Sequence, residues 1–438
     1  MESVWTNSIK LPVFEKLKGE IKTDVLIIGG GMCGILCAYL LKEAGINYVL
    51  VEGENIGTGI TKNTTAKITS QHGLIYNKLI KNSGKELAGM YLQSNELAIK
   101  KFRSICTNMD CDFEEKSAFT YTLTDRNKIE NEVKAVNSLG LKCKFIEQTN
   151  LPFATKGALR FDEQAQFNPL KFIAGIAVDL KIYEHTFVRE IEENTARTDD
   201  GKIIAKKMIV ATHFPFTNKH GSYFLKLFQH RSYVIAVKNG PNVNGMYVDE
   251  AQKGMSFRNY KDLLLIGGGD HRTGKNGGNW EELRKFTKQY YPKAQESFAW
   301  ATQDCMSLDG VPYIGHYSKH TPNLYVATGF NKWGMTSSMV SAMILADMVA
   351  GKDNAFREVF SPHRSMIKPQ LFINGFTAVT NLLIPTMKRC PHLGCALKWN
   401  SVEHTWDCPC HGSRFEEDGK LIDNPSTGSL KNVKINKS

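Results

Sequence analysis

Short apolar runs and amphipathic segments alternate along this chain and predict a mixed α/β protein. Residues 24–28 (DVLII) form an apolar, β-branched run that ends at three glycines, and a helical pattern of small and apolar residues follows to Ala44. A second apolar run, residues 48–51, ends at Glu52. This order of elements predicts a βαβ unit near the amino terminus.

Beyond this unit the pattern predicts a helical stretch, a second group of strands and a return to the first sheet. Residues 61–151 have helical, amphipathic spacing, whereas strand-like runs dominate residues 161–269. The runs 208–211 and 324–327 are apolar without alternation, which is typical of strands buried on both faces. We therefore expect these two strands to join the first sheet. After Gly351 a connecting stretch leads to a tail rich in Cys, His and Trp with frequent Gly and Pro, which predicts a separate last domain that begins near residue 385.

Length and composition narrow the classes of protein. The 438 residues are too many for one ordinary core, and 42% apolar with 23% charged residues is typical of globular domains. The most hydrophobic stretch, residues 371–385, is too short for a membrane span and is interrupted by Asn374 and Asn381. The start of the chain lacks the apolar region of a secretory signal. We therefore expect a cytoplasmic protein without a membrane span.

Charge and cysteine spacing add two further constraints. The net charge of +11 is spread along the chain without a dense basic block, so it does not indicate a nucleic-acid partner; mild attraction to an anionic partner stays open. Ten cysteines are present, of which six are scattered and four are crowded into 21 residues near the carboxyl end. In a long chain this spacing is more informative than the number of cysteines.

A glycine-rich motif lies between the first strand and the first helix. Gly29, Gly31 and Gly34 form G-x-G-x-x-G directly after the strand, and Glu52 ends the second strand. The first glycine permits a tight turn, the second lets the backbone approach a pyrophosphate, and the third allows the helix to pack closely on the strand. Glu52 would accept hydrogen bonds from the adenosine ribose. Strand, helix and acidic residue together favour a dinucleotide site over a purely structural turn.

Three further segments indicate which family the chain resembles. Residues 57–67 (GTGITKNTTAK) resemble the second FAD-contacting loop of the D-amino acid oxidase and glycine oxidase family, and residues 309–315 (DGVPYIG) and 324–351 resemble its closing FAD motif. The resemblance covers residues 22–351 and implies FAD as cofactor. A helix beginning near Gly334 could then stabilise negative charge on the reduced flavin. The other FAD contacts that it implies are Thr61, Thr65, Val188, Gly315, Gly329, Gly334, Met335 and Thr336.

Two segments depart from the simple glycine pattern. His213 follows the strand expected near the adenosine, at a position where this family usually has a glycine, which puts close backbone approach there in doubt. The second glycine cluster, residues 266–272, lacks a third spaced glycine and a following apolar helix. We therefore do not interpret it as an NAD(P) site.

The carboxyl-terminal tail contains a motif for a second cofactor. Cys390-x-His392 is separated by fifteen residues from Cys408-x-x-His411, so each of two loops offers one thiolate and one imidazole. Two cysteines and two histidines also suit tetrahedral zinc, but classical zinc fingers place both cysteines in one loop and both histidines in the other. One of each in both loops favours an iron–sulfur cluster, with zinc as the alternative.

This tail resembles the Rieske [2Fe–2S] proteins. The resemblance implies that the two cysteines of the motif hold one iron, that the two histidines hold the other, and that Cys395 and Cys410 form a disulfide between the loops. Rieske potentials lie at about −150 to +300 mV, against about −400 mV for plant-type ferredoxins. Ser413 matches the serine that raises the potential, but Phe415 replaces a tyrosine of the high-potential members. We therefore expect a lower potential than theirs, and an abbreviated β base.

The expected architecture combines these units. It has an α/β, Rossmann-like FAD-binding domain with an inserted antiparallel-sheet (α+β) substrate domain, and a small all-β Rieske domain. The boundaries are residues 22–351 for the oxidoreductase domain (FAD-binding parts 22–75, 180–215 and 305–351; substrate parts 150–180 and 216–300), 352–384 for a connector and 385–438 for the Rieske domain.

Together the two cofactors imply a relay from a two-electron donor to a one-electron carrier. The family resemblance implies a small amine or amino acid that is oxidised at its C–N bond by hydride transfer to flavin N5, with an unidentified protein as one-electron acceptor or donor. An alternative is an electron-transfer or redox-sensing protein without a small-molecule substrate. A third possibility is reverse flow, from the cluster to the flavin.

Candidate substrate residues are few, and catalytic residues are not identified. Tyr247 and Arg258 lie in the strand-rich region from which the family usually draws its carboxylate clamp, although such an arginine is more often structural. His72 follows the second flavin loop and is interpreted as a structural histidine. Cys305 precedes the closing motif and is interpreted as an ordinary buried cysteine.

Overall fold

A mainly parallel sheet forms the base of the computed structural model, which describes residues 2–251 and 253–431. Its central path has the order β16–β17–β10–β1–β2–β7, in which β17, β10, β1, β2 and β7 are parallel and β16 is antiparallel to β17. The bounds are β1 (Gly19–Ile28), β2 (Tyr48–Val51), β7 (Ile182–Tyr183), β10 (Gly201–Val210), β16 (Tyr313–His316) and β17 (Leu324–Thr328), and the hairpin β8 (Val188–Glu192) and β9 (Thr195–Thr198) extends from β10. The predicted return of β10 and β17 to the first sheet is confirmed.

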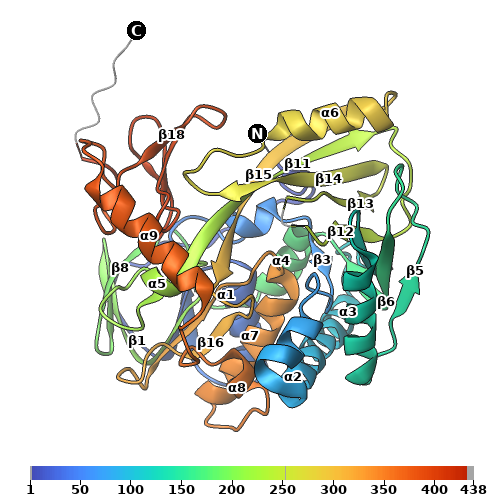
Figure 1. Ribbon diagram of the computed structural model, residues 1–438. Helices are drawn as coiled ribbons and strands as arrows, with labels where there is room; N and C mark the ends of the chain where they lie inside the picture. The colour runs from blue at the N-terminus through green and yellow to red at the C-terminus, as the bar shows by residue number, and fades with distance from the viewer. Residues whose placement is uncertain (1, 252, 432–438) are drawn as a thin grey trace.

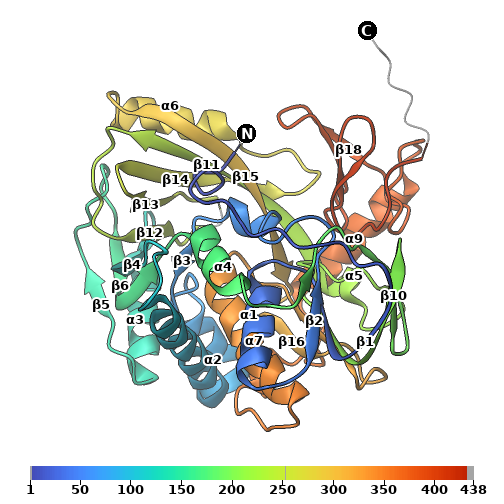
Figure 2. The ribbon, with the colours of Figure 1, turned by 180° about the vertical axis from the view of Figure 1, so that it is seen from behind.

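Two apolar helices cover this sheet. Helices α1 (Met32–Glu43) and α7 (Gly334–Val349) pack against each other, and α4 (Pro169–Ala177) packs on α1, as Figure 2 shows from behind. All four residues of β2 and all five of β17 are buried, which explains why their sequences show no polar alternation.

A second sheet lies above the first in Figure 1 and is mostly antiparallel, with the path β15–β11–β14–β13–β12–β4–β6–β3 and β5 paired to β6. Helix α6 (Trp280–Tyr290) covers its outer side, and α2 (Tyr76–Cys106) and α3 (Arg126–Ser138) lie below its far end. The remaining bounds are the 3₁₀ turn η1 (Ile60–Asn63), β3 (Lys67–Ile68), β4 (Glu114–Thr122), β5 (Lys144–Ile146), β6 (Gly157–Gln166), α5 (Tyr223–Lys226), β11 (Leu227–Lys238), β12 (Met246–Asp249), β13 (Ser256–Tyr260), β14 (Leu263–Arg272) and β15 (Gln295–Ser307).

Strand β4 corrects the sequence-based prediction that residues 61–151 are helical. Helices α2 and α3 lie in that stretch, but β4 between them pairs with both β6 and β12. Its first half, EEK, is charged and partly exposed, whereas only its second half is buried. Pairing with strands far along the chain therefore decides the structure of this segment.

The last part of the chain forms a small domain beside the parallel sheet. After α8 (Arg357–Phe360), the expected connector contains a regular helix, α9 (Pro369–Leu383). A four-stranded sheet follows, with β18 (Lys398–Asn400), β19 (Thr405–Asp407), β20 (Arg414–Phe415) and β21 (Leu421–Asp423). Its strands have only two or three residues, in agreement with the expected abbreviated base. No helix among the described residues has the length and apolar content needed to cross a bilayer.

Candidate functional site

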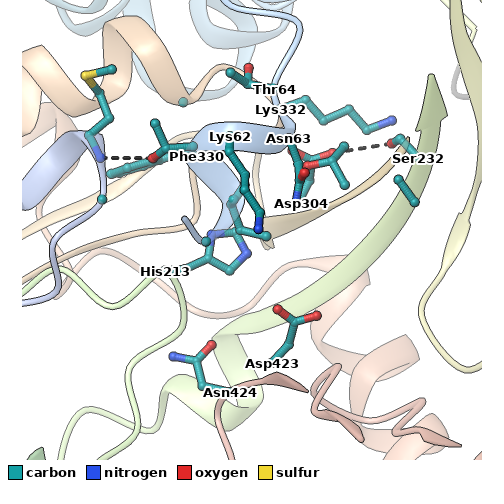
Figure 3. A pocket seen from close by; sticks show the side chains of 18 of the residues that line it. Lys62, Asn63, Thr64, His213, Ser232, Asp304, Phe330, Lys332, Asp423 and Asn424 are labelled. Atoms are coloured by element: carbon teal, nitrogen blue, oxygen red, sulfur yellow. Dashed lines mark hydrogen bonds between the residues drawn. The ribbon is translucent and has the colours of Figure 1, made fainter. Parts of the chain in front are cut away.

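A cavity of about 1090 Å³ lies between the two sheets and the last domain. Its lining includes the carboxyl end of β1 and residues that follow β2 and β10. Ligands of open α/β sheets bind at this edge. Figure 3 shows Lys62 to Thr64 on one side, Ser232 and Asp304 on another, and Asp423 and Asn424 of the last domain below them.

The glycine motif has the geometry that a pyrophosphate site requires. Gly29 has φ +112°, and a Cβ there would lie 2.6 Å from the carbonyl oxygen of Ala211. A Cβ at Gly34 would lie 1.8 Å from the carbonyl oxygen of Gly29, so only glycine lets α1 pack this closely. Gly31 instead faces the cavity, where a Cβ would meet only Thr61 Oγ1, at 3.4 Å. The space beside Gly31 therefore fits a phosphate group at the start of α1.

Glu52 lies at the edge of the same cavity. Its carboxylate accepts the amides of Gly30 at 2.5 Å and Glu54 at 3.0 Å. Burial raises the pKa of Glu52, while these amides oppose the rise. Each carboxylate oxygen accepts only one of these amides, so acceptor capacity remains for a ribose hydroxyl.

The other predicted FAD contacts divide into two groups. Five of them line the cavity: Thr61, Thr65, Val188, Gly334 and Met335. Three lie beside it. Gly315 would meet Pro362 with a Cβ, Gly329 would meet Leu227, and the hydroxyl of Thr336 donates to the carbonyl of Thr69. The positions of these three support a role in packing the loop and helix that face the cavity, not direct contact with a nucleotide.

The two weak candidates for a substrate clamp have structural surroundings. The ring of Tyr247 stacks on Phe119 with centroids 4.4 Å apart, inside the core of the second sheet. Arg258 is buried and donates from Nη1 to the carbonyls of Thr65 at 2.7 Å and Ala66 at 2.9 Å. Burial lowers its pKa to about 9. Arg258 therefore anchors the loop that carries Thr65 and does not face the cavity.

The interpretations of His72 and Cys305 as structural residues agree with their contacts. His72 is buried, contacts Tyr91 Oη at 2.6 Å through Nδ1, and stacks on Trp333, which lines the cavity. Burial lowers the pKa of His72 to about 3, so its ring is neutral. Cys305 is buried beside Thr328, and burial raises its pKa to about 12.

A group of charged residues that sequence reasoning missed lines the cavity on the side of the second sheet. The hydroxyl of Ser232 on β11 contacts the carboxylates of both Asp270 on β14 and Asp304 on β15, and Lys332 also contacts Asp270. Burial, partly offset by Lys332, raises the pKa of Asp304 to about 6. Pairing of β11 with β14 and β15 brings Ser232 close to Asp270 and Asp304, which lie 38 and 72 positions further along the chain. The spacing of these residues in the sequence therefore does not indicate that they lie together.

The backbone conformation of His213 explains how a histidine fits at a position where this family usually has a glycine. Its φ is +66°, so this residue adopts the left-handed conformation usually taken by glycine. Its backbone and ring line the cavity, and Nε2 lies 3.1 Å from Gln229 Oε1. Burial lowers the pKa of His213. The histidine thus keeps the turn and adds a polar side chain that points toward the last domain.

The four predicted cluster ligands come together in the last domain. Nδ1 of His392 and Nδ1 of His411 lie 3.3 Å apart, so both imidazoles present the same nitrogen to one point. Cys390 and Cys408 are buried and in hydrogen-bonding contact. One pair of thiols and one pair of imidazole nitrogens, carried by the same two loops, is the donor set of a Rieske cluster.

The remaining residues of the motif surround these ligands. Cys395 and Cys410 form a disulfide between the loops, with Cα atoms 6.7 Å apart. Ser413 hydrogen-bonds the thiol of Cys390, and Phe415 is fully buried among the four cysteines. Phe415 therefore occupies a position from which a hydroxyl could reach sulfur.

The cluster loops dock directly on the oxidoreductase domain. Gln229 donates to the carbonyl of His411 at 2.9 Å, and Arg272 donates to the carbonyls of Pro409 and Cys410 at 3.0 and 3.1 Å. On the ligand side, His392 Nε2 lies 2.8 Å from Asn218 Oδ1. These contacts place the cluster-binding site next to the strand that lines the cavity.

Comparisons with known proteins agree with both sites. The family model described as FAD dependent oxidoreductase matches residues 24–348, and that of the Rieske [2Fe-2S] domain matches residues 378–434. The chain is 33% identical to YhfW of Bacillus subtilis (strain 168), which is named as a Rieske 2Fe-2S iron-sulfur protein, over 99% of this chain and 98% of that one. It is 21% identical to gamma-glutamylputrescine oxidoreductase of Escherichia coli (strain K12), over 79% of this chain and 88% of that one.

A solved structure shares the fold of the first domain. The crystal structure of glycine oxidase from Geobacillus kaustophilus matches with a TM-score of 0.66 at 20% identity, over 79% of this chain and 99% of that one. The cavity with its glycine motif lies where open α/β sheets bind dinucleotides, and the histidine–cysteine site offers the donor set of a Rieske [2Fe–2S] cluster. The chain therefore belongs to the FAD dependent oxidoreductase family and carries a Rieske [2Fe–2S] domain at its carboxyl end.

Proposed function

We propose that the protein oxidises a small amine or amino acid at its C–N bond and passes the electrons through the Rieske cluster to a one-electron acceptor protein. When bound, FAD supplies hydride acceptance at N5 and the cluster supplies single-electron transfer. The substrate loses a hydride and a proton and leaves as an imine. A cytoplasmic location is part of this proposal.

The proposal rests on the contacts that join the cavity to the predicted cluster ligands. Asn424 of the cluster domain donates to the carbonyls of Thr212 and Phe214, which follow β10 at the cavity. His213 between them contacts Gln229, and Gln229 donates to the backbone of the cluster ligand His411. A short, buried chain of contacts thus joins the cavity to the cluster ligands, as a relay needs.

The side chains on the second sheet favour a cationic amine over an amino acid. Asp270 is paired with Lys332, whereas Asp304 contacts the hydroxyl of Ser232 and faces the cavity. Asn331 and Lys332 both have left-handed φ values, +51° and +72°, and such strain is concentrated at functional sites. Asp304 is therefore our candidate for holding a protonated amino group, while the two expected carboxylate-binding residues, Tyr247 and Arg258, lie in the core.

Anaerobic mixing of the holoprotein with a panel of amines and amino acids tests the proposal. We expect at least one compound to bleach the flavin absorbance, followed by the electron paramagnetic resonance signal of a reduced Rieske cluster. The control variant His392→Ala should show the bleaching without the cluster signal. If no compound bleaches the flavin, the protein is an electron carrier without a small-molecule substrate. Bleaching without cluster reduction in the parent would contradict the relay.

Metal analysis provides a separate check of the cluster assignment. We expect iron and acid-labile sulfide in equal amounts in the parent protein and their loss in His392→Ala and His411→Ala. Zinc without sulfide in the parent would contradict the proposal.

A further inference from the structure

Helix α9 presents an unusual apolar surface. Nine of the seventeen exposed large hydrophobic side chains among the described residues lie between positions 367 and 393. They are Ile367, Phe372, Ile373, Phe376, Val379, Leu382, Leu383, Met387 and Leu393. Such a concentration of exposed apolar side chains in one short segment of the chain is typical of an interaction surface.

The exposed side chains follow the helical repeat. Phe372, Phe376, Val379 and Leu383 are spaced by four, three and four residues, so they form one stripe along α9. Figure 1 shows α9 on the face of the molecule turned to the viewer, with no other element in front of it.

Polar side chains fix the helix with this face outward. Asn374, Thr377 and Asn381 form the buried side of α9. Asn374 accepts from Arg272 Nη1 at 2.9 Å and donates to the carbonyl of Leu225 at 3.2 Å. Rotating the helix to bury its apolar side would leave these buried polar groups without partners, which is costly. The buried hydrogen bonds therefore fix α9 in the orientation in which its apolar stripe faces outward.

The charge of the segment indicates the kind of surface that covers it. Residues 359–402 contain no Asp or Glu. Lys368 lies at the start of α9, and Lys388, Arg389 and Lys398 follow its end. Two copies joined through this face would bring like charges together, whereas an anionic lipid surface complements both the apolar stripe and the basic ends.

We propose that α9 is an interfacial helix that docks the protein on an anionic lipid bilayer, lying in the plane of the membrane. Ala378, on the inner side of α9, packs against the cluster cysteines, and a Cβ at Gly394 would lie 3.9 Å from Leu382. Docking through this helix therefore brings the cluster domain to the membrane surface while the oxidoreductase domain stays in water. The binding does not depend on which substrate the protein oxidises.

Flotation of the holoprotein with vesicles tests this inference. We expect binding to phosphatidylcholine vesicles that contain phosphatidylglycerol, weaker binding at high salt, and weak or no binding to phosphatidylcholine alone. The double variant Phe376→Glu, Leu383→Glu should reduce the partition coefficient at least about tenfold, because it places two acidic groups in the apolar stripe. Both positions are exposed, so the fold should persist, and flavin content and thermal unfolding check this.

The control is Val178→Glu, which changes another exposed apolar residue at the end of α4 and should leave vesicle binding unchanged. No binding of the parent to anionic vesicles, or equal binding of parent and double variant, would overturn the inference. Light scattering provides another contradicting outcome. A parent dimer that becomes monomeric in the double variant, without vesicle binding, would assign the stripe to contact between two copies.

Discussion

Three residues show how single side chains determine the properties of the cavity. Gly31 leaves room for a phosphate, His213 adopts a left-handed backbone and contacts Gln229, and Asp304 places a carboxylate near Ser232. The role of Gly31 was predictable because a glycine motif has a known physical task. The role of Asp304 was not, because its neighbours come from other strands.

Replacing Gly31 with Val should abolish FAD binding and leave the fold intact. Gly31 has φ −75°, which any residue adopts, and its Cβ position is open, so the valine side chain would occupy phosphate space without straining the protein. Absorbance at flavin wavelengths after purification and thermal unfolding measure the two effects. Gly89→Val, where a Cβ meets nothing within 4 Å, is the control. A full FAD content in Gly31→Val would refute the assignment of this loop.

Replacing Phe415 with Tyr should raise the reduction potential of the cluster. Phe415 is buried among the cluster cysteines, so a hydroxyl there could donate to sulfur and stabilise the reduced, more negative state. A hydrogen bond to a charged group, about 1.5 kcal/mol at the low end, corresponds to about 60 mV for one electron, and partial stabilisation of the oxidised state makes the shift smaller. Protein-film voltammetry measures it. An unchanged or lowered potential would show that the hydroxyl does not reach sulfur.

Replacing Asp304 with Asn should remove the part of the pH dependence of the free energy of unfolding that comes from this carboxyl group. Because the pKa of Asp304 is raised to about 6, the folded protein binds an extra proton between the ordinary value and about 6, so the free energy of unfolding falls as pH rises through this window. We expect Asp304→Asn to be more stable than the parent above pH 6, by about 2 kcal/mol or less because the carboxyl also faces the cavity.

Urea unfolding of both proteins between pH 4 and pH 7 measures this difference. Asp353→Asn, at an exposed position, is the control and should follow the parent. A constant difference between Asp304→Asn and the parent at all pH values would contradict the raised pKa.

At the scale of secondary-structure elements, prediction succeeded where local pattern and tertiary environment agree. The run 48–51 became β2 with the same bounds, and the helix expected up to Ala44 became α1. It failed for β4, because the charged first half of this segment does not have a strand pattern and the strand is stabilised by pairing with β6 and β12. Helix α9 lies in the stretch that was expected to be a connector. Its apolar side lies outward and its asparagines lie inward, the reverse of the usual pattern.

The contact between β11 and the cluster loop gives a prediction at this scale. Gln229→Leu removes the donor to the buried carbonyls of His411 and Asn424 and the partner of His213. We expect a loss of about 1–3 kcal/mol in the free energy of unfolding and slower reduction of the cluster by the flavin. Stopped-flow absorbance measures the rate.

Gln166→Leu is the matched control for this variant. Gln166 is a buried amide that donates to the carbonyl of Asn259, away from the cluster loops. It should lose stability to a similar extent and keep the electron-transfer rate. Equal rates in Gln229→Leu and the parent would show that this contact holds the domains together without affecting electron transfer.

At the scale of the whole molecule, the two domains share a buried ion-pair network that sequence analysis could not foresee. Glu403 accepts from Arg231 of β11 at 3.0 Å and from Arg414 of its own domain at 2.8 Å, and Arg414 also pairs with Asp407 and Asp423. Burial would raise the pKa of Glu403, but the two arginines lower it below its ordinary value. The carboxylate therefore stays charged and holds the cluster domain on the second sheet.

Glu403→Gln should loosen this attachment. It leaves the buried guanidinium of Arg231 without its paired carboxylate, while Arg414 keeps Asp407 and Asp423; breaking a buried pair costs about 3–5 kcal/mol. Because Glu403 and Arg414 line the cavity, we also expect faster loss of FAD on dialysis. Thermal unfolding and flavin fluorescence measure both effects. Glu296→Gln, in a surface pair with Arg284, should cost at most about 1 kcal/mol and retain FAD.

The wall that the last domain adds to the cavity also bears on how the protein is made in the cell. Residues 420–424 and 427–429 line the cavity, yet they leave the ribosome after every other part of the FAD site has been synthesised. Their sheet adjoins the two loops that carry the predicted cluster ligands, and metal binding stabilises the loops that hold the metal. We therefore expect a form of the protein without the cluster to retain FAD less well.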